Sequence, residues 1–163
     1  MAATPLDREA FVARYGSLFE HSPWVAEGAW ARRPSDDREA VFAAMVETIR
    51  AAPPDKQLAL IRAHPDLAGR AAVARTLTPD STREQASAGL DRLTPEEHAQ
   101  FTRANAAYRE RFGFPFVICV REHDKASILA AAEERLRHDR EHEIEIALTE
   151  IEKIARLRLE DLQ

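Results

Sequence analysis

Apolar residues recur at helical spacing along most of this chain. Before Pro53 the recurring positions are Val41, Phe42, Met45, Val46 and Ile49. Beyond Asp124 the spacing continues in two stretches that meet near His138-Asp139, with Ile128, Leu129, Ala132 and Leu136 in the first and Ile144, Leu148, Ile151, Ile154, Ala155 and Leu159 in the second. Residues three and four apart share one face of an α-helix, so the pattern predicts one amphipathic helix that Pro53 ends and two long ones toward the C-terminus.

Prolines that follow a capping residue mark further helix starts. Thr4-Pro5, Ser22-Pro23 and Thr94-Pro95 each place a hydroxyl before a proline that suits the first helical position. Thr94 and Glu97 also have the spacing of a capping box, and Gly113 is a good residue to end that helix. We therefore expect helices from Pro95 to about Phe112, from the Ser35-Asp36-Asp37 cap to Pro53, and from about Pro54 to Ala63.

One segment, Phe114 to Val120, is apolar without helical spacing. A lone apolar run with no second alternating segment to pair with cannot make a sheet, so we interpret it as a buried extended connector. The chain has no repeat of fixed period and no low-complexity tract. The prediction is an all-α protein, one domain over residues 1–163, with about seven to nine helices around a single core.

Composition narrows the class of protein and its partners. The 163 residues are 45% hydrophobic, enough for one core, and the net charge of −5 comes from both signs interspersed along the chain, which argues against a nucleic-acid partner. Cys119 is the one cysteine, so neither an intrachain disulfide nor a cysteine-rich zinc site is expected. The first residues do not look like a signal peptide, the last three are not a peroxisomal address, and no apolar run is long enough to cross a membrane, so we expect a cytoplasmic protein with no membrane partner.

Three residues stand out as candidates for chemistry. His64 precedes a proline at a predicted helix end, Glu84 follows Ser81 at capping-box spacing, and Arg121 ends the buried connector. Each also has a structural interpretation, as a partner of a helix C-terminal dipole, as part of a helix cap, and as half of an ion pair. An imidazole, a carboxylate and a guanidinium nevertheless form a minimal set for acid–base chemistry on an anionic substrate.

A fourth candidate is the sequence His138-Asp139-Arg140-Glu141-His142, which matches the H-x-x-E-H pattern of one metalloprotease class. It lies in a highly charged stretch with 21 residues after it, which leaves little room for a distant third ligand. A solvated helix face is the better interpretation, and no metal site is expected. A metal-dependent hydrolase that uses His138 and His142 stays open as an alternative.

The chain resembles the 2-oxo-4-hydroxy-4-carboxy-5-ureidoimidazoline (OHCU) decarboxylase family over nearly its whole length. The resemblance lies in several segments in the same order, namely Leu18-Phe19-Glu20-His21-Ser22-Pro23-Trp24, His64 to Arg70, Ser81 to Leu90, Phe112 to Arg121 and Ile154 to Leu159. It implies an all-helical homodimer that needs no metal or organic cofactor and converts OHCU to (S)-allantoin and carbon dioxide in urate degradation. The wide apolar faces of the two C-terminal helices agree with a dimer.

The resemblance also implies roles for individual residues. His64 would be the acid–base residue, Glu84 would act with it on the substrate, and Arg121 would pair with substrate charge. The residues expected to line the substrate site are Pro65, Ser81, Thr82, Arg83, Glu84, Gln85, Phe116, Val117, Ile118, Cys119 and Val120. A non-enzymatic helical oligomerisation or binding module, in which His64, Glu84 and Arg121 only support structure, is the alternative that remains.

Overall fold

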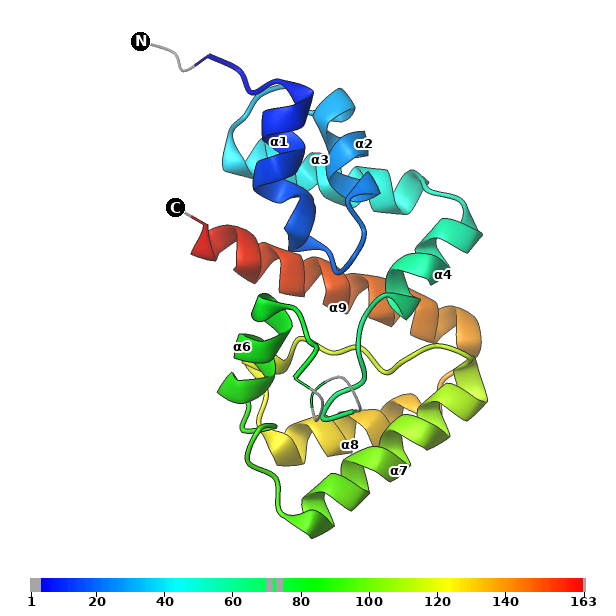
Figure 1. The fold of residues 1–163 in the computed structure, drawn as a ribbon. Coiled ribbons are helices and arrows are strands. Elements are labelled where there is room, and N and C mark those ends of the chain that lie inside the picture. The colour runs from blue at the N-terminus through cyan, green and yellow to red at the C-terminus, as the bar shows by residue number, and fades with distance from the viewer. Residues whose placement is uncertain (1–3, 70–71, 73–74, 163) are drawn as a thin grey trace. The chain divides into compact units, whose positions relative to one another are not determined.

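The computed structural model describes residues 4–69, 72 and 75–162, and in these ranges its regular structure is helical, with no strand (Figure 1). The α-helices are α1 (Arg8–Tyr15), α2 (Trp24–Arg32), α3 (Arg38–Ala51), α4 (Pro54–Arg62), α6 (Pro79–Ser87), α7 (Pro95–Phe112), α8 (Lys125–Arg135) and α9 (Arg140–Asp161). Two short 3₁₀ helices, η1 (Gly16–Leu18) and η2 (Val120–Glu122), complete the described regular structure. The all-α prediction is confirmed, and the eight α-helices in the described ranges agree with the predicted number.

Capping signals located several helices correctly. In α7 the Thr94 side chain accepts from the backbone N–H of Glu97 and the Glu97 side chain accepts from that of Thr94, so the predicted capping box is present. Gly113 ends α7 in the left-handed region at a φ of 80°, where a residue without Cβ is favoured. Asp37 caps α3, and α8 and α9 are separate helices on either side of His138-Asp139, as the apolar spacing predicts.

Two predicted caps were wrong. Thr4 lies outside α1, whose N-cap is Asp7 with its carboxylate accepting from the Ala10 N–H at 2.8 Å. The Ser22 hydroxyl donates to the Glu20 carbonyl at 2.8 Å instead of capping α2. A carboxylate at a helix N-terminus also gains from the helix dipole, and serine can equally well bond a nearby carbonyl, so a Ser/Thr-Pro pair alone does not fix a helix start.

The described chain forms two compact units. The first contains the residues up to Ala63 together with those from Glu152 onward, and the second contains His64–Ile151. Helix α9 contributes residues to both units, whereas each other helix belongs to one. The single domain over residues 1–163 stays a prediction.

The first unit is built on α1, α2 and α3, with the end of α9 joined to it by ion pairs. Helix α2 packs against both α1 and α3. In its interior the Arg158 guanidinium donates to the Glu20 carboxylate at 2.8 Å, and both side chains are almost completely buried. Arg50 of α3 donates to both carboxylate oxygens of Glu152, at 2.8 and 3.2 Å. These charge-assisted bonds connect residues more than a hundred positions apart.

The second unit has an aromatic core around Tyr108. The Tyr108 ring centroid lies 4.7 Å from that of Phe112, 5.9 Å from that of Phe114 and 5.3 Å from that of Phe116. Burial raises the pKa of the Tyr108 hydroxyl, which therefore stays protonated and donates to the buried Glu143 carboxylate at 2.5 Å. This core connects α7 to the start of α9.

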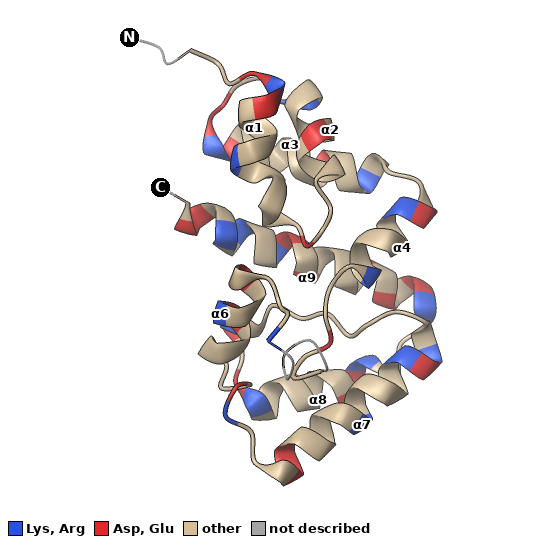
Figure 2. Ribbon diagram, in the orientation of Figure 1, with Lys and Arg blue, Asp and Glu red and all other residues tan. Residues whose placement is uncertain are grey.

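Charges of both signs share the same helices, as Figure 2 shows for α7 and α9. This arrangement agrees with the interspersed charge pattern of the sequence, which argued against a basic stripe for nucleic acid. Within the described residues, no helix has the length and apolar character required to cross a bilayer.

Candidate functional site

His64 begins a short loop that follows directly on α4. Helix α4 ends at Arg62 with Ala63 as its C-cap, as the His-Pro pair predicted, and the His64 side chain is buried. We call residues 64–69 the His64 loop. Its conformation is unusual, because Ala68 has a φ of 52°, in the left-handed region that alanine rarely adopts. Arg70, the last residue of the His64 motif in the sequence, lies outside the described residues.

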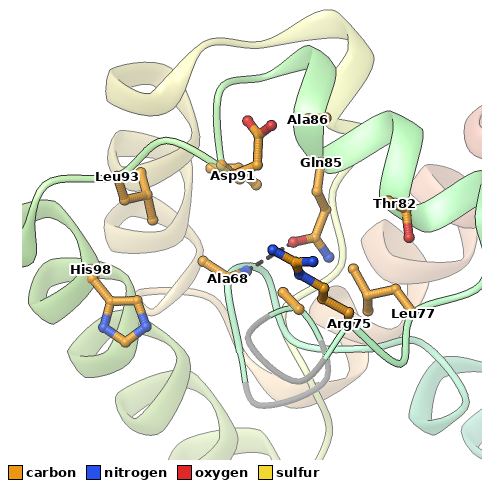
Figure 3. Close-up of a pocket in the computed structure, with 11 residues that line it drawn as sticks. Ala68, Arg75, Leu77, Thr82, Gln85, Ala86, Asp91, Leu93 and His98 are labelled. Atoms are coloured by element: carbon orange, nitrogen blue, oxygen red, sulfur yellow. Dashed lines mark hydrogen bonds between the residues drawn. The ribbon is translucent and has the colours of Figure 1, made fainter.

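Side chains from two helices hold this loop in place. The Gln85 side-chain carbonyl of α6 accepts from the Ala68 N–H at 3.0 Å, which Figure 3 shows as a dashed line. Asn105 of α7 donates its amide to the Leu67 carbonyl at 2.8 Å. One turn further along α7, Arg109 pairs with Asp66 at 2.9 Å. The backbone after His64 is therefore fixed from outside the loop.

Helix α6 carries the second group of predicted site residues and begins earlier than expected. Thr78 is its N-cap and accepts from the Ser81 N–H, with Pro79 in the first turn, so Ser81 and Glu84 do not form the capping box that their spacing suggested. Thr78-Pro79 has the same threonine-proline pattern as Thr94-Pro95. A capping residue followed by proline is a stronger signal for a helix start than the Ser81–Glu84 spacing, and it sets the first residue of α6. Ser81 and Gln85 are buried and Glu84 is half-buried.

The two remaining predicted residues of α6 face solvent. The Thr82 hydroxyl donates to the Thr78 carbonyl at 2.9 Å, and Arg83 forms an ion pair with Asp80. Both side chains are exposed and are bonded within their own helix. Ser81, Glu84 and Gln85 are thus buried or half-buried, whereas Thr82 and Arg83 are exposed.

The predicted connector from Phe114 to Val120 is buried along its whole length, as expected, and has no helix or strand as far as Cys119. Its last residue, Val120, already belongs to η2. Two buried charged side chains bond its backbone. Arg135 donates to the Val117 carbonyl at 2.6 Å, and the Glu150 carboxylate accepts from the Cys119 N–H at 3.2 Å. Arg135 is itself held by Glu143 at 2.7 Å. Hydrogen bonds from charged side chains therefore satisfy two backbone groups of this segment in place of the ladder of a sheet.

Arg121 follows the connector in η2 and its side chain is exposed. Helix α6 packs against η2, which brings the helix of Glu84 beside the turn of Arg121. Burial raises the pKa of the Cys119 thiol to about 11, and the charges of Glu122, Glu150 and Glu84 add to this effect. His64, Glu84 and Arg121 all belong to the second unit.

A pocket of about 560 Å³ lies beside the His64 loop and α6 (Figure 3). Two of the predicted substrate-binding residues, Thr82 and Gln85, line this pocket. Its other polar side chains include Arg75, Asp91 and His98, and Leu77, Leu90 and Leu93 supply apolar surface. It is thus open to a small, partly polar molecule.

The H-x-x-E-H match does not form the arrangement that its metalloprotease counterpart needs. His138 lies before α9, so the two imidazoles are not one turn apart on a helix, although their ring centroids are 4.4 Å apart. The His138 Nδ1 atom lies 2.8 Å from the Glu143 carboxylate, which already binds Arg135 and Tyr108. His142 and Glu141 are exposed, as the interpretation of a solvated face expects. Among the residues that the structure describes, no group of three or more His, Cys, Asp or Glu side chains could hold a metal ion.

The sequence matches the family model described as OHCU decarboxylase over residues 4–160. The chain belongs to the OHCU decarboxylase family. A relative from Halalkalicoccus jeotgali, 2-oxo-4-hydroxy-4-carboxy-5-ureidoimidazoline decarboxylase, is 44% identical over 156 residues, which are 96% of this chain and 86% of that one. Two crystal structures of similar proteins extend the comparison to the fold.

One of these is the crystal structure of (S)-allantoin synthase, with a TM-score of 0.72 and 30% identity, covering 96% of this chain and 50% of that one. The other is the crystal structure of OHCU decarboxylase in the presence of (S)-allantoin, with a TM-score of 0.70 and 25% identity, covering 96% of this chain and 98% of that one. The family resemblance expected from the sequence is confirmed.

Sequence reasoning missed the residues that support the predicted site. Asn105, Arg109 and Arg135 carry no motif, and their positions on α7 and α8 looked like ordinary polar faces. Arg135 offered one signal in retrospect, because it falls near the apolar positions Ile128 and Ala132, where a cation needs a partner. Asn105 offered none.

Proposed function

We propose that this chain catalyses the decarboxylation of OHCU to (S)-allantoin in urate degradation, with His64, Glu84 and Arg121 as its catalytic residues. The observation that carries the proposal is the family match over residues 4–160 combined with the presence of all three residues in one unit, where α6 packs on η2. The burial of His64 and the bonds that hold its loop support a role that needs a fixed imidazole.

The proposed roles follow the chemistry of each group. His64 transfers protons, because an imidazole titrates near neutral pH. Glu84 engages the substrate hydroxyl together with His64, and Arg121 pairs with substrate charge through its planar fork of donors. Pro65 lines the site beside His64.

Further residues of the two segments would form the walls of the substrate site. Glu84 and Gln85 hold the polar groups of the ring and the ureido group, and Ser81, Thr82 and Arg83 supply neighbouring contacts. The connector offers backbone hydrogen bonds to the substrate. Thr82 and Arg83, which are exposed, have the weakest support among the proposed substrate contacts. The connector residues concerned are Phe116, Val117, Ile118, Cys119 and Val120.

The reaction itself makes few demands on the protein. The bond to the carboxylate breaks, carbon dioxide departs, and the electron pair flows into the imine nitrogen of the substrate ring, which serves as the electron sink. A proton then reaches the neighbouring carbon, formerly the imine carbon, from one face, while the hydroxyl group gives up its proton and becomes the ring carbonyl. The face of protonation sets the S configuration. The protein orients the substrate and transfers protons, and the proposal involves no cofactor.

A homodimer and a cytoplasmic location are further parts of the proposal. The homodimer rests on the wide apolar faces of α8 and α9 in the sequence and on the family resemblance. The cytoplasmic location rests on the sequence alone.

The test is a coupled assay with freshly made substrate. Urate oxidase and hydroxyisourate hydrolase generate OHCU from urate, the protein is added, and the ultraviolet decay is followed together with the circular dichroism of the allantoin. Acceleration with an excess of one enantiomer supports the proposal. Decay at the spontaneous rate to racemic allantoin would remove it.

The variant His64→Asn tests the acid–base role. Asparagine keeps polarity but cannot titrate, so the rate should fall by at least about two orders of magnitude, the scale of general acid–base catalysis. The measurement is the initial decay of enzymatically generated OHCU, with folding checked by circular dichroism and binding by titration with (S)-allantoin. His142→Asn, at an exposed histidine, is the control and should keep the wild-type rate. His138→Asn should do little beyond a modest change in stability, because His138 lies against Glu143. Full activity in His64→Asn would contradict the acid–base role of His64.

A further inference from the structure

The His64 loop has a conformation that its own sequence does not favour. Ala68 adopts a φ of 52°, and a Cβ atom added to Gly69 would lie 2.8 Å from the Asp66 Cβ, closer than such atoms approach. A left-handed alanine is strained, and such strain persists only where surrounding contacts impose it. Contacts from α6 and α7 must therefore maintain the turn that follows His64.

The three side-chain contacts that hold the loop differ in how much each contributes to its stability. The Arg109–Asp66 pair is open to solvent, with half of the Arg109 side chain exposed, so it contributes little. Gln85 is buried and bonds Ala68 from α6 (Figure 3), but it is already a proposed substrate residue. Asn105 is half-buried and donates to the carbonyl of Leu67, a buried residue that would lose this partner if the amide were removed.

Helix α7 is a rigid support for this contact. Its N-terminus is fixed by the Thr94–Glu97 capping box and its C-terminus by the left-handed Gly113, and Asn105 lies between them. The buried Tyr108, less than one turn beyond Asn105, packs into the aromatic core. The position of the Asn105 amide is therefore determined by the core of the second unit.

From these contacts we infer that Asn105 is a positioning residue, which sets the place of the His64 imidazole by holding the Leu67 carbonyl. Leu67 is three residues after His64, and the ring of Pro65 between them fixes one backbone dihedral angle. A shift of Leu67 is therefore passed on to the His64 backbone, because few dihedral angles between them can absorb it. A proton-transfer group must lie within hydrogen-bond reach of its substrate atom, and small displacements cost rate. The inference rests on the proposed role of His64.

The first test is kinetic and uses Asn105→Ala. Alanine is the better helix former, so α7 should stay intact while the amide is lost. We expect kcat to fall by about tenfold or more with KM changed by less than about twofold, because proton transfer is impaired and substrate contacts remain. The matched control is Thr102→Ala on the same helix, whose hydroxyl donates to the His98 carbonyl, and it should keep wild-type kinetics.

The second test shows whether Asn105 acts through His64. In a His64→Asn background the added Asn105→Ala change should cost less than about twofold, since residues acting as one unit are not additive. Independently of activity, the ¹H–¹⁵N ring signals of His64, assigned by their loss in His64→Asn, should shift or broaden in Asn105→Ala. The ring signals of His21 and His123 should not change.

These measurements separate the two hypotheses. An inactive wild-type protein would remove the proposed function, whereas the ring signals would still decide whether Asn105 places His64. An active wild-type protein with an impaired His64→Asn variant would overturn the inference if Asn105→Ala kept full kcat, raised KM alone, or left the His64 ring signals unchanged. An equal loss in Thr102→Ala would also overturn it, because the effect would then be a general loss of helix stability.

Discussion

Single residues in the second unit have properties that their neighbours set. Cys119 is an example, because the buried connector and nearby carboxylates make its thiol hard to ionise, and its pKa rises to about 11 from an ordinary value of 9.0. Arg121, two residues later, has an exposed side chain. Two positions that are two residues apart in the sequence thus differ sharply in their exposure to solvent.

The Cys119 thiol should react slowly with iodoacetamide. At pH 8 the folded protein holds almost no thiolate, so alkylation should be at least about tenfold slower than in the urea-unfolded chain, as measured by mass spectrometry. The folded state keeps this proton to higher pH than the unfolded state, so its contribution to stability is present below about pH 9 and is lost as pH rises toward 11. Equal alkylation rates in the folded and unfolded chain would contradict the burial of this thiol.

Arg121→Lys tests the importance of the guanidinium fork. Lysine keeps the charge but cannot form two parallel hydrogen bonds, so we expect a loss of about 1–3 kcal/mol in transition-state binding, measured from kcat/KM. Because Arg121 is exposed, folding should stay intact. Arg92→Lys, at another exposed arginine, serves as the control. Turnover near that of the wild type would remove Arg121 from the site.

At the scale of elements, a buried ionic cluster organises the connector. Glu143 is completely buried and binds Arg135, Tyr108 and His138, and Arg135 in turn bonds the connector at Val117. The Arg135 guanidinium also lies over the Phe116 ring at 4.6 Å. The extended segment that carries the proposed substrate contacts therefore depends on charges from α8 and α9.

Glu143→Gln should be strongly destabilising. The change keeps side-chain size but leaves the buried Arg135 without a counter-charge, and breaking such a pair costs roughly 3–5 kcal/mol. Urea denaturation gives the free energy of unfolding. Glu141→Gln, an exposed glutamate on the first turn of the same helix, should change it by less than about 0.5 kcal/mol. A loss in Glu143→Gln no larger than in Glu141→Gln would show that the cluster contributes little.

Helix positions were predictable where several local signals agreed. Thr94-Pro95 with Glu97 and Gly113 gave both ends of α7, and the apolar spacing gave α8 and α9. A single signal was less reliable, because Asp7 caps α1 in place of Thr4. The His64 motif could be recognised from the sequence, but the left-handed Ala68 and its Asn105 support depend on contacts between residues 38 positions apart, which no local pattern encodes.

At the scale of the whole molecule, assembly is the open prediction. We expect a homodimer in solution, with twice the mass of the 18.4-kDa chain, because the apolar faces of α8 and α9 are wide enough for more than one neighbour. Light scattering coupled to size-exclusion chromatography measures the mass directly. A monomer at tens of micromolar protein would count against the dimer.

The path of the chain through the two units has a consequence for synthesis on the ribosome. The second unit is a continuous stretch, His64–Ile151, but the first needs residues from Glu152 onward, including Arg158, which pairs with Glu20 138 positions earlier. The second unit has its complete sequence before translation ends, whereas the first acquires its last partners only when the final turns of α9 emerge. Until Arg158 has been synthesised its ion pair with Glu20 cannot form, so the first unit is the last part of the chain to complete its native contacts.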